Sequence, residues 1–158
     1  MSSLVKILSG FLAVCLFSVG CQQQRFEPYR GYKMSPYRLR GERFVPMSIE
    51  QALQYREEGV ASHYEADGKV GAIGQRLFRG QLYAAHRTLP LPCDVRITNL
   101  ATGKSCVARV ADRGPFVPGR LIDVSTEAAH RLGFHRQGLE RVRVEVLSVG
   151  DGPWRRTR

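Results

Sequence analysis

The chain has 158 residues, enough for one domain of modest size with extra segments. Its hydrophobic content of 43% is that of an ordinary globular protein. The 24 basic and 14 acidic residues give a formal net charge of +10, which favours a polyanionic partner such as nucleic acid, anionic lipid or an acidic polymer. The arginines are scattered along the chain, which is not the pattern of a nucleic-acid-binding stripe.

The first 21 residues have the pattern of an export signal. An almost wholly apolar run covers 7–19, the small residue Gly20 follows, and Cys21 comes next. The run is shorter than the ~20 apolar residues of a membrane-spanning helix, which favours a cleaved signal. The segment resembles a bacterial lipoprotein signal, in which the cysteine after a small residue is lipidated. An ordinary secretory signal is the alternative.

The lipoprotein resemblance also implies a location. Gln22 stands where an Asp would resemble an inner-membrane retention signal, so the expected destination is the periplasmic face of the outer membrane. Acyl chains on Cys21 would hold the chain there, because each buried methylene contributes ~0.8 kcal/mol. An exported protein is not expected to meet nucleic acid. The membrane surface and cell-wall polymer are therefore the expected partners.

The segment that follows the signal is predicted to be an extended tether with one short helix. Residues 22–45 show no sustained hydrophobic period. A helix is predicted over 46–58, because Ser48 and Gln51 form a capping-box pattern and Gly59 suits the position after a helix end.

Short strands separated by turns are predicted for most of the remaining chain. Valines alternate with charged residues over 141–147, which is typical of a half-buried strand. Such strands with little helix indicate an all-β sandwich or small barrel. The further strands are predicted at 60–64, 95–98 and 105–110, one helical turn at 81–86, and a helix from Ser125 to Leu132 that ends at Gly133.

The segment 112–116, Asp-Arg-Gly-Pro-Phe, places a carboxylate and a guanidinium at the end of an apolar strand. The Gly-Pro step turns the chain, and a second short strand ends in Asp123. Functional groups in a loop at a strand end commonly form a site. The alternative is that Asp112 and Arg113 only cap a tight turn.

Several motifs accompany this segment and together resemble the rare lipoprotein A (RlpA) family in order, spacing and turn residues. The resemblance covers 59–147 and implies a six-stranded double-psi β-barrel, which agrees with the all-β prediction. It further implies lytic transglycosylase activity on peptidoglycan glycan strands, preferably strands without stem peptides. The motifs are Gly-Val-Ala-Ser-His-Tyr at 59–64, Tyr-Ala-Ala-His-Arg-Thr-Leu-Pro at 83–90, Val-Arg-Ile-Thr-Asn-Leu at 95–100, and the segments 112–116 and 122–125.

The resemblance assigns catalytic roles residue by residue. The family's Asp falls on Asp112 and its His on His86, although His86 could instead only fix its loop by hydrogen bonds to the backbone. The family's catalytic Glu falls on Gln75, which cannot transfer a proton, so activity is expected to be weakened if that Glu is essential. Glu65, in the same loop region, is a candidate replacement.

Substrate contacts are expected from five residues near these positions. His63 stands where the family has a Trp, and it is expected to line the groove or to pack. Asp123 is expected to contact substrate, or alternatively to orient Arg113 or the turn. The five residues are His63, Tyr64, Arg113, Phe116 and Asp123.

The family's reaction sets a requirement on the acid. In lytic cleavage the sugar's own 6-hydroxyl closes on the anomeric carbon, so one carboxyl can act first as acid and then as base. That carboxyl must hold a proton near neutral pH, which requires a raised pKa. The guanidinium of Arg113 would oppose this if it reached Asp112.

Cys93 and Cys106 would meet an oxidising compartment after export. With the hairpin turn at 102–103, however, Cys106 faces Asn99 and Cys93 lies six residues further along, roughly 20 Å away. A disulfide needs Cα atoms within ~7 Å, so the register argues against one unless the turn or the barrel curvature differs. No His/Cys spacing suggests zinc, and no cofactor is expected.

The sequence thus predicts a signal peptide over 1–20, a tether with a short helix over 21–58, the barrel domain over 59–147 and a frayed basic tail over 148–158. The leading functional hypothesis is an RlpA-like lytic transglycosylase anchored in the outer membrane. The alternatives are a non-catalytic peptidoglycan-binding or division-site scaffold with division-site protein partners, and a basic protein bridging the wall and anionic lipid.

Overall fold

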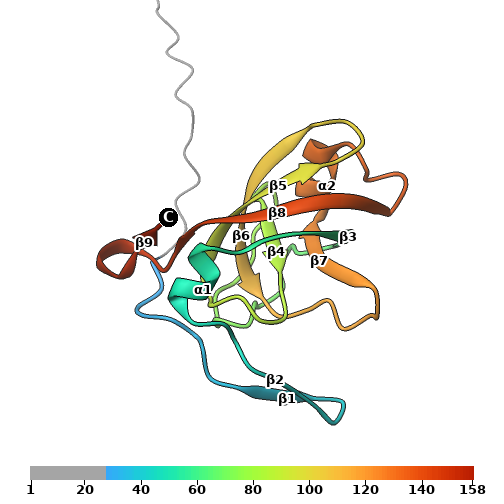
Figure 1. The fold of residues 1–158 in the computed structure, drawn as a ribbon. Helices are drawn as coiled ribbons and strands as arrows, with labels where there is room; N and C mark the ends of the chain where they lie inside the picture. The colour runs from blue at the N-terminus through green and yellow to red at the C-terminus, as the bar shows by residue number, and fades with distance from the viewer. Residues whose placement is uncertain (1–27) are drawn as a thin grey trace, which may run out of the picture.

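The computed structural model describes residues 28–158, in which a β-barrel follows a small N-terminal hairpin (Figure 1). The predicted signal peptide and the lipid attachment at Cys21 lie outside the described residues. No helix within 28–158 has the length and apolar character needed to cross a membrane.

Six strands close into the barrel. The sheet order is β3-β7-β4-β6-β5-β8, and β3 also pairs with β8, which closes it. The β3–β7 and β4–β6 pairs are parallel and the remaining barrel pairs are antiparallel. The prediction of an all-β, six-stranded barrel is confirmed. The strands are β3 (Arg56–Tyr64), β4 (Tyr83–Ala85), β5 (Cys93–Asn99), β6 (Ser105–Asp112), β7 (Arg120–Ser125) and β8 (Leu139–Val149).

Alternating valines fill the barrel. Val142, Val144 and Val146 are fully buried, and Val144 and Val146 lie opposite Ile97 and Val95 on β5. The period-2 pattern predicted this, because inward and outward side chains alternate along a strand.

The caps of the two short helices are those that the sequence predicted. In α1 (Ile49–Leu53), Ser48 forms the N-cap and completes a capping box with Gln51. In α2 (Thr126–Leu132), Ser125 is the N-cap and Gly133 is the C-cap, with φ 81° in the left-handed region.

The predicted end of the first helix is wrong. The helix ends at Leu53, and β3 begins at Arg56 because this segment pairs with β8. Gly59 lies inside β3, where a Cβ would approach the Cβ of Leu121 to 2.7 Å. The glycine therefore permits close strand approach and does not end a helix.

The predicted helical turn at 81–86 is also wrong. Residues Tyr83–Ala85 form β4, and all three are buried between β6 and β7. A three-residue apolar run gives no usable period, so pairing with the neighbouring strands decides its conformation.

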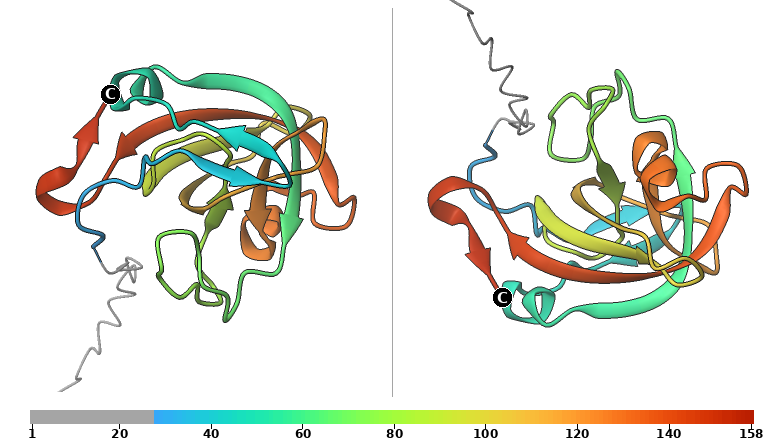
Figure 2. Two further views of the ribbon diagram at one scale, coloured as in Figure 1. Left: turned by 90° about the horizontal axis from the view of Figure 1, so that it is seen from below. Right: turned by 90° about the horizontal axis from the view of Figure 1, so that it is seen from above.

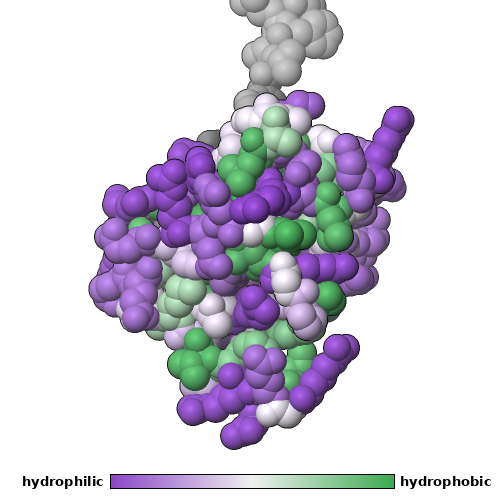
Figure 3. Space-filling model, turned by 45° about the vertical axis from the view of Figure 1, so that its right-hand side comes forward, coloured by the Kyte–Doolittle hydropathy of each residue, from purple (hydrophilic) through white to green (hydrophobic). Residues whose placement is uncertain are grey.

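The N-terminal and C-terminal segments are more ordered than the sequence indicated. Within the predicted tether, β1 (Tyr37–Leu39) and β2 (Glu42–Phe44) form an antiparallel hairpin that lies across one end of the barrel (Figure 2). Hydrophilic side chains cover that end of the molecule, with hydrophobic surface directly above them (Figure 3). Within the predicted frayed tail, the 3-10 helix η1 (Gly152–Trp154) leads to β9 (Arg156–Thr157), which pairs with β8.

Both described cysteines are free thiols. Cys93 lies opposite Val110, and Cys106 lies opposite Ile97 instead of Asn99, so the hairpin register differs from the prediction by two residues. Four positions along β5 therefore separate Cys93 from Ile97, the residue opposite Cys106.

Candidate functional site

Asp112 is the last residue of β6, where this strand runs parallel to β4. The register shifts between Ala84 and Ala85, which lie opposite Val110 and Asp112 respectively. The extra residue on β6 is a β-bulge, which resets the side-chain alternation along the strand. Asp112 therefore comes onto the same face of the strand as Arg109.

Two backbone N–H groups bind the carboxylate of Asp112. Arg113 N–H donates to Oδ1 over 2.8 Å, and Ala72 N–H donates to the same oxygen over 3.1 Å. Burial raises the pKa of Asp112 by more than these two bonds and the charges of Lys69 and Arg113 lower it. The raised pKa has the direction that a proton donor near neutral pH requires.

The guanidinium of Arg113 donates its hydrogen bonds to backbone carbonyls and not to the carboxylate of Asp112. Its Nη1 donates to Leu89 O over 2.5 Å and to His86 O over 3.3 Å, and its Nη2 donates to Lys33 O over 3.1 Å. The guanidinium carbon also lies 5.4 Å from the ring centroid of Tyr37. Arg113 thus ties the N-terminal segment to the loop after β4.

Tyr64, at the end of β3, lies close to two carboxylates. Its phenolic oxygen is buried and has no hydrogen-bond partner among the described residues. Burial, followed by the negative charges of Asp112 and Asp123, raises the pKa of this phenol. The Nζ atom of Lys69 lies 5.4 Å from the ring centroid. The structure therefore brings Asp112 and Asp123 close enough to Tyr64 for their charges to act on its phenol.

The carboxylate of Asp123 is bound to Ser62 and not to Arg113. Its Oδ1 accepts a hydrogen bond from the hydroxyl of Ser62 on the neighbouring strand β3. That hydroxyl also accepts from Nη1 of Arg120 over 3.2 Å. Asp123 therefore fixes the β3–β7 pair beside Tyr64.

Gln75, at the position of the family's catalytic Glu, faces a buried ion pair. Its Oε1 accepts from Nη2 of Arg109 over 3.4 Å. Arg109, which is 4% exposed, binds both carboxylate oxygens of Asp151 over 2.8 and 2.6 Å. Arg109 holds the pKa of Asp151 below its usual range. Asp151 thus supplies the counter-charge of Arg109, while Gln75 adds a neutral acceptor.

The same loop connects Gln75 to Asp112. Gly71 N–H donates to Gln75 O over 2.9 Å, and the next residue, Ala72, donates its N–H to the carboxylate of Asp112. A Cβ on Gly71 would lie 2.7 Å from Ala111 O, so only glycine lets the loop approach the bulge this closely.

The imidazole of His86 is engaged at both nitrogens and is 4% exposed. Nδ1 accepts from the N–H groups of Thr88 and Leu89 over 3.2 and 3.1 Å, so Nε2 carries the proton and faces Tyr55 Oη at 3.0 Å. Burial, followed by the charges of Arg87 and Arg113, lowers the pKa of His86 to about 3. The geometry corresponds to the loop-fixing role that the sequence left as the alternative.

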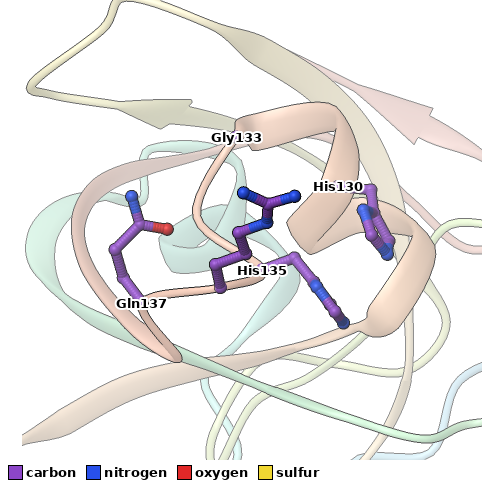
Figure 4. A pocket seen from close by; sticks show the side chains of 5 residues that line it. His130, Gly133, His135 and Gln137 are labelled. Carbon is purple, nitrogen blue, oxygen red and sulfur yellow. The ribbon is translucent and has the colours of Figure 1, made fainter.

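His63 and Phe116 make contacts with the residues after α2 and with the N-terminal hairpin, respectively. Nε2 of His63 contacts the carbonyl of His135 at 3.1 Å, so His63 packs beside α2. His130 and His135 stack with centroids 3.8 Å apart beside a hollow of about 290 Å³ (Figure 4). Across residues 28–158 no group of three His, Cys, Asp or Glu side chains could hold a metal ion. Phe116 packs edge-on against Phe44 of the hairpin.

The candidate replacement Glu65 has a local role. It is exposed, and its Oε1 accepts from Asp67 N–H over 3.2 Å.

The sequence-based predictions did not include Arg109, Lys69 and Asp151. Arg109 had a signal, because an arginine within the apolar strand Cys-Val-Ala-Arg-Val-Ala needs a buried counter-charge. Asp151 gave none.

Comparison with known proteins decides the family. A family model described as "Lytic transglycolase" matches residues 56–144, from β3 into β8. A protein of Rickettsia bellii, named endolytic peptidoglycan transglycosylase RlpA, is 36% identical over 84% of this chain and 69% of its own length. The chain belongs to the RlpA family. RlpA proteins of Rickettsia felis and Pseudomonas aeruginosa strain UCBPP-PA14 are 44% and 45% identical over 75% and 76% of this chain.

This RlpA-family chain spans 54% of the R. felis protein and 36% of the P. aeruginosa protein.

Solved structures of other proteins share the fold of this chain. The apo expansin of Clavibacter michiganensis has a TM-score of 0.50 at 19% identity, covering 63% of this chain and 54% of that one. The Streptomyces papain inhibitor has a TM-score of 0.51 at 18% identity, covering 60% of this chain and 96% of that one.

Proposed function

We propose that this RlpA-family protein is a lytic transglycosylase that cleaves peptidoglycan glycan strands, with Asp112 as the group that transfers protons. The observation that carries the proposal is the half-buried carboxyl of Asp112, whose pKa is raised. It lies close to the buried phenol of Tyr64, which has no hydrogen-bond partner within 28–158. The names of the relatives, endolytic peptidoglycan transglycosylases, support the substrate class.

The first half of the reaction breaks the glycosidic bond. Protonated Asp112 gives its proton to the bridging oxygen, the bond from this oxygen to the anomeric carbon breaks, and the departing strand keeps the proton as a hydroxyl. The sugar that remains carries positive charge at its anomeric carbon. The Asp112 carboxylate formed at that moment is stabilised by the N–H groups of Ala72 and Arg113.

The second half closes the anhydro ring. The Asp112 carboxylate takes the proton of the sugar's 6-hydroxyl, whose oxygen bonds to the anomeric carbon, and the carboxyl is again protonated. The phenol of Tyr64 stays protonated beside Asp112 in this step, because burial and the negative charges of Asp112 and Asp123 raise its pKa. No water enters the reaction.

His86 and Gln75 have supporting roles in this proposal. A histidine with a pKa of about 3 is neutral at the working pH, so His86 fixes the loop after β4 and transfers no proton. Gln75 holds its loop beside Arg109. The reaction then runs with one carboxyl, at a rate reduced by the missing Glu.

The experiment incubates the purified protein with peptide-free glycan strands and searches by mass spectrometry for fragments ending in a 1,6-anhydro sugar. We expect such fragments from the wild-type protein and none from Asp112→Asn. Strand binding without fragments would favour the non-catalytic scaffold. Fragments with an ordinary reducing end would contradict the lytic mechanism, because those require water.

We further propose that Cys21 carries a lipid that anchors the protein to the periplasmic face of the outer membrane. The apolar run at 7–19 and the Gly20–Cys21 junction support this. Cys21→Ala should then move the protein from the membrane fraction to the soluble fraction. Division-site proteins are partners that the family resemblance implies, and capture of such proteins from crosslinked dividing cells would test for them.

A further inference from the structure

A hollow of about 570 Å³ lies where the two ends of the described chain meet. Residues from the first described turn and from the C-terminal loop line it together: Pro28, Tyr29, Arg30, Asp151, Pro153 and Trp154. Figures 1 and 2 show the same proximity, since the N-terminal segment runs beside the loop that precedes β9 in every view. The hollow lies outside the site around Asp112.

Specific contacts hold the walls of the hollow in place. Tyr29 N–H donates to Oδ2 of Asp151 over 2.8 Å, and Asp151 in turn binds Arg109. The hydroxyl of Tyr32 donates to Trp154 O, and the two rings meet edge to face with centroids 6.2 Å apart. Because these contacts fix both segments, the hollow is preformed.

Gly150 makes this junction possible. It has φ 78°, and a Cβ there would lie 2.5 Å from the ring of Tyr32 and 2.7 Å from Trp154 O. A side chain at this position would therefore push the two walls apart.

The lining has the chemistry of a sugar-binding surface. Trp154 is 47% exposed, an unusually open position for the largest aromatic side chain. An indole ring offers a flat apolar face against which the C–H face of a pyranose can pack, and its N–H can bond a hydroxyl. Arg30, exposed on the rim, adds hydrogen-bond donors for ring substituents.

The hollow is joined to Asp112 by a short path of contacts. Lys33 follows Tyr32, and its Nζ donates to Ala72 O over 2.5 Å while its carbonyl accepts from Arg113. Ala72 N–H in turn binds the carboxylate of Asp112. Residues 28–33 therefore connect the wall of the hollow to the loop that binds the carboxylate of Asp112.

We propose that this hollow is a distal sugar subsite, in which Trp154 packs against a pyranose ring of the same glycan strand that Asp112 cleaves. The inference rests on the proposed function, and it adds a second point of attachment for a long strand. Such a subsite makes the protein prefer strands long enough to span both points.

The sequence offers a direct probe, because Trp154 is the single tryptophan of the chain. Full-length protein carrying Asp112→Asn, which prevents cleavage, is titrated with purified peptide-free glycan strands while tryptophan emission is recorded. We expect a saturable emission change with long strands and none with a single disaccharide. Strand binding by sedimentation without an emission change overturns the subsite.

Kinetics of variants give a second measurement. On long strands we expect Trp154→Ala to raise KM about tenfold with kcat within about twofold, a loss of roughly 1.4 kcal/mol of binding. Trp154→Phe should recover most of this. The control is Leu139→Ala, which removes a side chain of matched exposure, 48%, at the opposite end of β8 and should leave KM unchanged.

The outcomes separate the subsite from the activity. An emission change without anhydro products leaves the subsite standing and removes the proposed reaction. Anhydro products, with an unchanged KM for Trp154→Ala and no emission change, overturn the subsite and leave the reaction standing. If Trp154→Ala fails to fold, the emission titration decides, because it uses the natural tryptophan.

Discussion

The side-chain oxygen of Gln75 accepts a hydrogen bond from Arg109 over 3.4 Å, at the position where the family resemblance places a catalytic carboxylate. Asp151 binds the same guanidinium through both of its oxygens. Asp151, in the C-terminal segment, therefore neutralises the buried guanidinium of Arg109. The uncharged side chain of Gln75 can then contact Arg109 without supplying a counter-charge.

Gln75→Glu should increase the rate of cleavage. The new carboxylate would lie beside Arg109, which lowers its pKa, so it would be ionised near neutral pH and would stabilise the positive charge that develops on the sugar. We expect a gain of at least about tenfold, below the 10²–10⁴-fold that general acid–base catalysis can supply. The rate of anhydro-product formation measures it.

Gln75→Met is the matched control for that change, because it keeps the length of the side chain and removes the amide. Its rate should fall or stay level. If Gln75→Glu left the rate unchanged, position 75 would play no part in the chemistry.

Asp112→Asn should abolish cleavage and raise stability at neutral pH. The folded-state pKa of Asp112 is raised, so the folded protein is disfavoured once this carboxyl ionises. The amide keeps an oxygen that accepts from Ala72 and Arg113 without placing a charge there. Thermal midpoints at pH 7 should therefore be higher for the variant.

Because the pKa of Asp112 is raised in the folded protein, the stability advantage of Asp112→Asn should disappear in acid. Below the unfolded pKa of about 3.9, the wild-type carboxyl is protonated in both states. An advantage that persisted unchanged at pH 3 would contradict the raised pKa. Asp67→Asn, a change at an exposed carboxylate, serves as the comparison.

Asp151→Asn should destabilise the protein by about 3–5 kcal/mol, because it removes the carboxylate that neutralises a buried guanidinium. The pKa of Asp151 is lowered, so its stabilising contribution is present above the unfolded value and is lost as pH falls through the lower folded value. Urea denaturation at pH 7 measures the loss.

An exposed ion pair provides the control for this experiment. Glu58 and Arg143 lie 2.6 Å apart with side chains 42% and 31% exposed, so Glu58→Gln should cost at most about 1 kcal/mol. Equal losses for the two variants would mean that the Arg109–Asp151 pair is not effectively buried.

His86 should make stability depend on pH between about 6.5 and 3. Its pKa is lowered to about 3 in the folded protein, so the unfolded chain binds the proton first as pH falls, and stability drops over this interval. In His86→Gln that part of the pH dependence should be missing. The activity profile should show no inflection from this histidine near pH 6.5, and rescue of an inactive variant by added imidazole would contradict the loop-fixing role.

The sequence predicted the parts that depend on local patterns. The valine alternation at 142–146 and the caps at Ser48, Ser125 and Gly133 reflect short-range geometry, and the structure has them all. The bulge before Asp112 is not predictable from such local patterns, because it depends on the pairing of β6 with β4.

The errors come from partners that are far apart in the chain. The sequence pattern places Gly59 at a helix end, because the approach of Leu121 is not visible in the sequence. Arg109 and Asp151 are 42 positions apart, and Asp151 sits in a tail without any period. Residues 28–33 and the C-terminal tail carry no local signal of ordered structure, because each is held by contacts with the other.

The docking of residues 28–33 on the barrel has a mechanical consequence. If Cys21 carries the lipid, the seven residues 21–27 lie between the acyl chains and Pro28, the first described residue, and the next residue, Tyr29, is bound to Asp151. A fully extended chain of that length reaches ~25 Å at most. The protein would then cleave only those wall strands that pass within about one domain's width of the lipid surface.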